Sequence, residues 1–109
     1  MNPQRSAFSA PPAHFLAEWY QAGLTEEHLD RIAAQLTDSA ASAAPPDLST
    51  RLLTMLAVPS DEVVFGVFAA DSAQAVVNAC LRAGLPVDRL TPAAVRVAGD
   101  RIDGPLRGR

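Results

Sequence analysis

Residues 71–90 read DSAQAVVNACLRAGLPVDRL, which is the pattern of a short helix with a start signal, a stop signal and a fixed exit. We expect Asp71 to cap this helix, with Gln74 three residues later completing a capping box. The apolar residues that recur at helical spacing are Ala73, Val76, Val77, Cys80 and Leu81. Gly84 can adopt the left-handed conformation that closes a helix, and Pro86 prevents its continuation. The stretch therefore predicts a helix with one buried face.

The sequence on either side of this helix predicts four strands and a second helix. The expected elements, in chain order, are a strand at residues 14–20, a helix capped by Thr25, a loop at 39–47, a strand from 48 or 51 to 58, a strand at 63–69, the helix above and a strand at 93–97. Pro45 and Pro46 exclude helix from the loop, and residues 59–62 form the turn of a hairpin. The order β-α-β-β-α-β predicts an α+β, ferredoxin-like fold, with a four-stranded antiparallel sheet and two helices on one face.

The second and third predicted strands are apolar on both faces. In the third strand, Phe65 and Val67 alternate with Val64 and Phe68. Two helices cover only one face of such a sheet, and soluble proteins rarely leave a large apolar patch bare. We therefore expect a homodimer that packs sheet to sheet. The residues expected in the core under the helices are Phe65, Val67, Val76, Val77, Cys80, Leu81, Leu29 and Ile32.

Composition limits the class of protein. The 109 residues, 49% of them hydrophobic, suffice for one domain with a modest core. A net charge of −3 argues against a nucleic-acid-binding groove. The single cysteine excludes an internal disulfide and fits a reducing compartment. No apolar run approaches the roughly 18 residues of a membrane span, and the N-terminus lacks the apolar segment of a signal peptide. We expect a cytoplasmic protein without nucleic-acid or membrane partners.

The two ends of the chain have the composition of loops. Residues 1–13 are rich in Pro, Ser and Ala and predict a disordered arm, while residues 98–109 hold three glycines and charges of both signs and predict a flexible tail. The ferredoxin-like domain is expected at residues 14–97. All nine basic residues are Arg, which with the many Ala and Pro residues is typical of a GC-rich bacterial gene.

Several short motifs are shared with a known family. They are GLT at residues 23–25, SDEV at 60–63, DSA at 71–73 and, most specific, RAGLPVDRL at 82–90. With these motifs, residues 15–97 resemble the small ferredoxin-like proteins catalogued as domain of unknown function 4242, whose members include nickel-binding bacterial proteins. The resemblance implies a ferredoxin-like fold and dimerisation through the sheet.

The resemblance does not extend to a nickel site. The metal-binding relatives carry a histidine near the positions that are Glu18 and Trp19 here, and another where this chain has Leu85. Nickel prefers an imidazole lone pair, and leucine offers none. His14 and His28 are not spaced as a chelating pair. We therefore expect neither a metal nor a cofactor.

Four residues are candidates for binding a ligand, namely His14, Glu18, Trp19 and Arg89. Glu18 is a carboxylate between apolar neighbours, which makes it a candidate acid or base in the cleft between sheet and helices. Trp19 either lines a pocket or packs in the core, and His14 is either a ligand contact or a surface residue. Arg89 either clamps a substrate or forms a local ion pair with Asp88. Cys80 is expected to be a buried, structural thiol.

Three classes of function stay open. The favoured one is a binding module that holds a small apolar ligand or a protein partner in the cleft between sheet and helices. The second is a cofactor-free enzyme of the small dimeric monooxygenase or isomerase type, which needs a polar pair in the cavity; Glu18 is the one inward candidate. The third is a degenerate metal-binding protein. Catalysis is disfavoured because the sequence contains no GxSxG, phosphate-binding glycine loop or CxxC motif.

Overall fold

A computed structural model describes residues 13–43 and 49–98 of the chain. The elements, in chain order, are strand β1 (Ala13–Tyr20), helix α2 (Glu26–Ala41), strand β2 (Arg51–Val58), a 3₁₀ turn (Pro59–Asp61), strand β3 (Val63–Ala70), helix α3 (Ala73–Arg82) and strand β4 (Arg89–Ala93). The order β-α-β-β-α-β confirms the predicted α+β fold. The predicted arm and tail lie outside the described residues, apart from Ala13, which opens β1, and Ala98.

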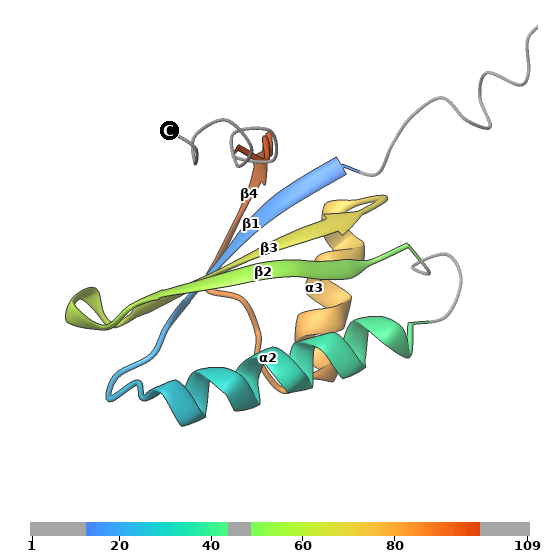
Figure 1. Cartoon of the computed structure of the whole chain (residues 1–109). Coiled ribbons are helices and arrows are strands. Elements are labelled where there is room, and N and C mark those ends of the chain that lie inside the picture. Colours follow the sequence, from blue (N-terminus) through green and yellow to red (C-terminus); the bar gives the residue numbers. More distant parts are fainter. Residues whose placement is uncertain (1–12, 44–48, 99–109) are drawn as a thin grey trace, which may run out of the picture.

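The four strands form one antiparallel sheet in the order β2-β3-β1-β4. Both helices lie on the same face of this sheet (Figure 1), which is the ferredoxin-like arrangement. No helix in the described part of the chain lies over the opposite face, which we call the open face. The fold therefore has two layers, with its core between the sheet and the helices.

The core beneath the helices is filled by side chains from every layer. The residues that make it up are Phe15, Ala17, Trp19, Ile32, Leu36, Val64, Phe68, Ala70, Ala75, Val76 and Cys80. Trp19 and Phe68 are its largest members, and their rings meet at a tilt of 59° with centroids 6.5 Å apart. The space between sheet and helices is therefore occupied by packed side chains where they meet.

The ends of α3 follow their sequence signals, with two differences at the N-terminus. Ser72, not Asp71, is the N-cap, because its hydroxyl accepts a hydrogen bond from the Ala75 N–H at 3.1 Å. Gln74 donates to Asn78 instead of completing a capping box. At the other end Gly84 has φ +77°, and the N–H groups of Gly84 and Leu85 donate to the carbonyls of Leu81 and Cys80. This is a Schellman closure, as the glycine predicts.

Two predicted boundaries are wrong. Helix α2 runs to Ala41, two residues past the start of the expected loop, because Ser39 and Ala40 bury their side chains against the rest of the fold. The last strand is Arg89–Ala93 instead of residues 93–97. That strand contains Pro92, which is tolerated because β4 is an edge strand with a neighbour on one side only.

The predicted core was assigned to the wrong face of β3. Val64, Gly66 and Phe68 point towards the helices, whereas Phe65 and Val67 lie on the open face and are only half-buried. The prediction for Leu81 is also wrong, since this residue is 57% exposed on α3. Ile32, Val76 and Cys80 are confirmed as buried, and Leu29 and Val77 are half-buried.

The alternation of β2 changes at a bulge. The pairing with β3 shifts register between Leu52 and Thr54, which leaves Leu53 as an extra residue. Beyond the bulge Met55 and Ala57 pack against the core, and Leu56 turns to the open face. A strict two-residue alternation would place Leu56 on the same face as Leu52, and the bulge puts the two leucines on opposite faces.

Candidate functional site

The open face of the sheet is organised in rows that run across the four strands. The rows, each written in the order β2, β3, β1, β4, are Arg51, Ala69, His14 and Ala93; then Thr54, Val67, Leu16 and Thr91; then Leu56, Phe65, Glu18 and Arg89. Side chains of paired residues lie on the same face and are neighbours at about 4.5–5.5 Å between Cβ atoms. The centre of the open face is thus apolar, and its β4 side and one end carry charges.

An open hollow of about 530 Å³ lies on this apolar centre. The residues that line it are Leu16, Thr54, Leu56, Phe65 and Val67, together with Met55, which follows the bulge in β2 and also packs against the core. Leu56 is 61% exposed, which is unusual for a leucine in the middle of a strand. Phe65 and Val67 line this hollow. The sequence did not indicate them as site residues, because its pattern placed both in the core under the helices.

Glu18 and Arg89 face one another at the β4 side of the hollow. Their Oε2 and Nε atoms are 3.8 Å apart, with 14% of the Glu18 side chain and 67% of the Arg89 side chain exposed. That distance is an ion pair beyond hydrogen-bonding range. The predicted local pair of Arg89 with Asp88 is not the one formed. Asp88 instead accepts the Tyr20 N–H at 2.8 Å and donates its own N–H to the Glu18 carbonyl at 2.9 Å.

Three of the four candidate ligand-binding residues therefore share the open face. His14 is half-buried in the end row, on the same face of β1 as Leu16 and Glu18. The expectation that Glu18 points into the cleft between sheet and helices is wrong, because the alternation of β1 directs Phe15, Ala17 and Trp19 to that side.

Trp19 is the candidate that lies elsewhere. It is 2% exposed in the core, and its indole Nε1–H donates to the Leu85 carbonyl at 2.8 Å. The core alternative for Trp19 is therefore the observed one. Its hydrogen bond ties β1 to the segment that leaves α3, which helps to place Arg89 at the edge of the sheet.

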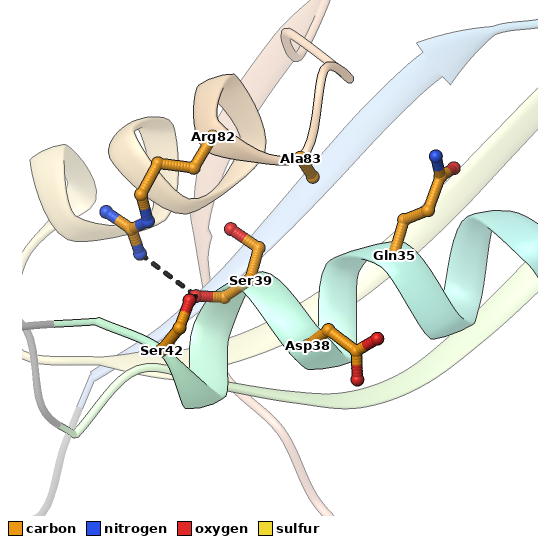
Figure 2. A pocket seen from close by; sticks show the side chains of 6 residues that line it. All are labelled: Gln35, Asp38, Ser39, Ser42, Arg82 and Ala83. Atoms are coloured by element: carbon orange, nitrogen blue, oxygen red, sulfur yellow. Dashed lines mark hydrogen bonds between the residues drawn. The ribbon is translucent and has the colours of Figure 1, made fainter.

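A second hollow of about 710 Å³ lies between the C-terminal halves of α2 and α3, and we call it the helix groove (Figure 2). It is lined by Gln35, Asp38, Ser39, Ser42, Arg82 and Ala83. The buried Ser39 hydroxyl donates to the Ala79 carbonyl at 2.7 Å, and Arg82 Nη2 donates to the Ser39 carbonyl at 3.2 Å. In Figure 2 the Arg82 side chain reaches from α3 across to α2, while the side chains of Gln35 and Asp38 point away from Arg82. These contacts join the two helices.

The remaining reactive side chain is Cys80, whose thiol is buried. Desolvation raises the pKa of that thiol to about 12. A thiol of this kind is a poor nucleophile and metal ligand at neutral pH, as expected for a structural residue. In the part of the chain that the structure describes, no group of three His, Cys, Asp or Glu side chains is placed to hold a metal ion.

No family model and no curated protein matches this chain. Among solved structures, the chain is similar to SCO4226 from Streptomyces coelicolor A3(2). The TM-score is 0.68 and the sequences are 19% identical, with 78% of this chain and 100% of that chain covered. At this identity the likeness supports the ferredoxin-like fold. None of the helices in residues 13–43 and 49–98 has the length and apolar character needed to cross a membrane.

Proposed function

We propose that this protein is a homodimeric binding module that holds a small apolar ligand between the open faces of two copies. The observation that carries the proposal is the hollow of about 530 Å³ on a sheet face that no described helix covers. Pockets for small molecules have about 300–1,000 Å³ and mostly apolar walls with a few polar groups. The hollow meets both conditions, with Glu18 and Arg89 as the polar groups beside it.

The size of the open face supports a second copy as its cover. Three strands of eight residues and one of five, at about 3.4 Å per residue and about 4.8 Å apart, give a face of roughly 470 Å². Two such faces bury roughly 1,000 Å² in total, which is near the lower bound for a specific interface. The face carries both signs of charge, on Glu18, Arg51 and Arg89, so two copies do not meet with a single sign of charge.

The enzyme alternative has one observation in its favour. The Glu18 carboxylate lies beside Phe65 in the same row, so it is within reach of a molecule in the hollow and is the residue we assign as a base if catalysis occurs. A cofactor-free monooxygenase or isomerase then uses the same shared chamber. The degenerate metal-binding role is the weakest alternative, because the described residues offer no ligand cluster. Membership of the family named above, and a bacterial cytoplasmic origin, stay predictions.

Two exposed leucines provide the test of the dimer. Leu56 lies on the open face with 61% exposure, and Leu81 lies on α3 with 57% exposure. We expect light scattering to give a dimer mass for the native chain at micromolar concentration. Leu56→Arg should give a monomer because it places a charge in the apolar interface, and Leu81→Arg should stay a dimer.

Binding is measured in the same samples with naphthalene as an uncharged apolar probe, followed by its own fluorescence. Saturable binding is expected for the native chain and for Leu81→Arg, and its loss for Leu56→Arg. A monomer mass for the native chain, or naphthalene binding that survives in Leu56→Arg, overturns the proposal.

A further inference from the structure

We infer that the ligand of the open face carries a neutral hydroxyl group on its apolar body, and that Glu18 and Arg89 recognise this group together. The inference rests on the proposed function and deepens it by naming the class of ligand. It is drawn from the position of the two side chains, from their exposure and from the hydrogen bonds that they leave unmade.

The position of Glu18 makes it the polar end of the hollow. Leu56, Phe65, Glu18 and Arg89 form one row across the sheet, so the carboxylate is the direct neighbour of a ring that lines the hollow. Leu16, two residues earlier on β1, also lines it. A molecule that covers Leu16 and Phe65 therefore places its edge next to the Glu18 carboxylate.

The Glu18 carboxylate lacks hydrogen-bond donors. Its side chain is only 14% exposed, yet its one described partner, Arg89 Nε, lies at 3.8 Å. No hydrogen bond from the described residues reaches its oxygens. The oxygens of Glu18 are not among the buried polar atoms that lack a partner, so water still reaches them in the free chain. A molecule that fills the hollow displaces this water and leaves the carboxylate without a donor unless it supplies one, so the site favours a ligand with an O–H or N–H group at this edge.

Arg89 selects among the donors. Its side chain is 67% exposed, and its guanidinium carries five N–H donors, none of which bonds to a described acceptor. A hydroxyl donates its hydrogen to Glu18 and accepts one from Arg89, so it satisfies both partners. A cationic head group is repelled by the like charge of Arg89, and an anionic head group is repelled by the like charge of Glu18. The pair therefore favours a neutral hydroxyl over either ion.

Three related probes test this inference at neutral pH, namely naphthalene, 2-naphthol and 2-naphthoate, each titrated into the full-length dimer. We expect 2-naphthol to bind about tenfold or more tighter than naphthalene, since a hydrogen bond to a charged group contributes roughly 1.5–3 kcal/mol. The 2-naphthoate anion should bind more weakly than 2-naphthol. In Glu18→Leu the tenfold preference should disappear while naphthalene still binds, and Glu18→Gln should keep part of it.

A matched pair of arginine variants separates recognition from general charge. Arg89→Gln should lower the preference for 2-naphthol, whereas Arg51→Gln, in the end row of the same face, should leave it unchanged. Equal affinities of naphthalene and 2-naphthol for the native dimer overturn this inference and leave the proposed function standing. Tighter binding of 2-naphthoate than of 2-naphthol also overturns it. Failure of naphthalene itself to bind overturns the proposed function instead.

Discussion

At the scale of single residues, Gly66 leaves no room for a side chain beside Trp19. A Cβ atom added at Gly66 lies 3.0 Å from Trp19 Cζ3 and 3.2 Å from Cη2. The ring cannot move away easily, because it is 2% exposed and its N–H is bonded to the Leu85 carbonyl. We expect Gly66→Ala to lower the free energy of unfolding by about 1–3 kcal/mol, as overpacked cores do. Urea unfolding followed by Trp19 fluorescence measures it.

The control for this prediction is the same substitution with a smaller ring at position 19. In a Trp19→Phe background, read by circular dichroism, Gly66→Ala should cost clearly less, since the two contacting atoms belong to the part of the indole that phenylalanine lacks. Equal costs in both backgrounds mean that the strain lies in the backbone of β3 and not in contact with the ring.

The same residues explain why the face of β3 was predicted wrongly. Phe65 and Val67 on one side and Val64 and Phe68 on the other are equally apolar, so alternation alone offers two equivalent solutions. The distinguishing signal is Gly66. A glycine in the middle of a strand marks a close approach by a neighbour, and the neighbour here is a core indole. Side chains on the glycine's face belong to the core, which leaves the other two for the open face.

At the scale of elements, α3 is a helix whose burial is confined to a narrow stripe. Ala75, Val76, Ala79 and Cys80 are buried, and Leu81 lies outside the stripe with 57% of its surface exposed. Leu36 on α2 is fully buried. We expect Leu36→Ala to cost about 2–5 kcal/mol in free energy of unfolding and Leu81→Ala less than about 0.5 kcal/mol. The two variants remove the same atoms, so the difference reports burial.

Chemical denaturation of both leucine variants under one buffer condition makes the comparison. A cost for Leu81→Ala close to that for Leu36→Ala contradicts the docking of α3 described above. It also indicates that Leu81 is covered in solution, by a part of the chain or by another copy.

Helices and strands could be predicted where capping, turn and apolar residues mark them in the sequence. The residues at which these elements begin and end could be predicted less often. Thr25 caps α2 through the His28 N–H at 3.0 Å, and Gly84 closes α3, both as the sequence indicates. The N-cap of α3 moved by one residue because Asp71 and Ser72 are both good capping residues. The position of β4 depends on pairing with β1, which is a tertiary interaction, so the apolar pattern near Pro92 did not locate it.

At the scale of the whole molecule, the fold could be predicted and most of the site could not. The order of elements and the rule of two helices on one face follow from local patterns and from the general properties of β-α-β-β-α-β chains. One row across the sheet joins Leu56, Phe65, Glu18 and Arg89. This row depends on the pairing register of all four strands, and the bulge at Leu53 shifts the register of β2. The sequence therefore proposed Glu18 and Arg89 as candidates without showing that they meet.

The stability of the whole molecule should depend on pH through Cys80. Burial raises the pKa of its thiol from 9.0 to about 12, so above pH 9 the unfolded chain loses a proton that the folded chain keeps. The folded state then binds more protons than the unfolded state, and its stability falls as pH rises from about 9 towards 12. The native chain should lose about 1 kcal/mol more between pH 8 and pH 10 than Cys80→Ala.

Urea unfolding of the two chains at both pH values measures this difference. Cys80→Ala is less stable at every pH because it leaves a cavity, so the comparison concerns the change with pH and not the absolute stability. Val76→Ala, a buried deletion that retains the thiol, is the matched control and should show the native pH dependence. A native chain whose stability changes between pH 8 and pH 10 no more than that of Cys80→Ala shows that the thiol already meets solvent in the folded state, which contradicts its place in the core between α3 and the sheet.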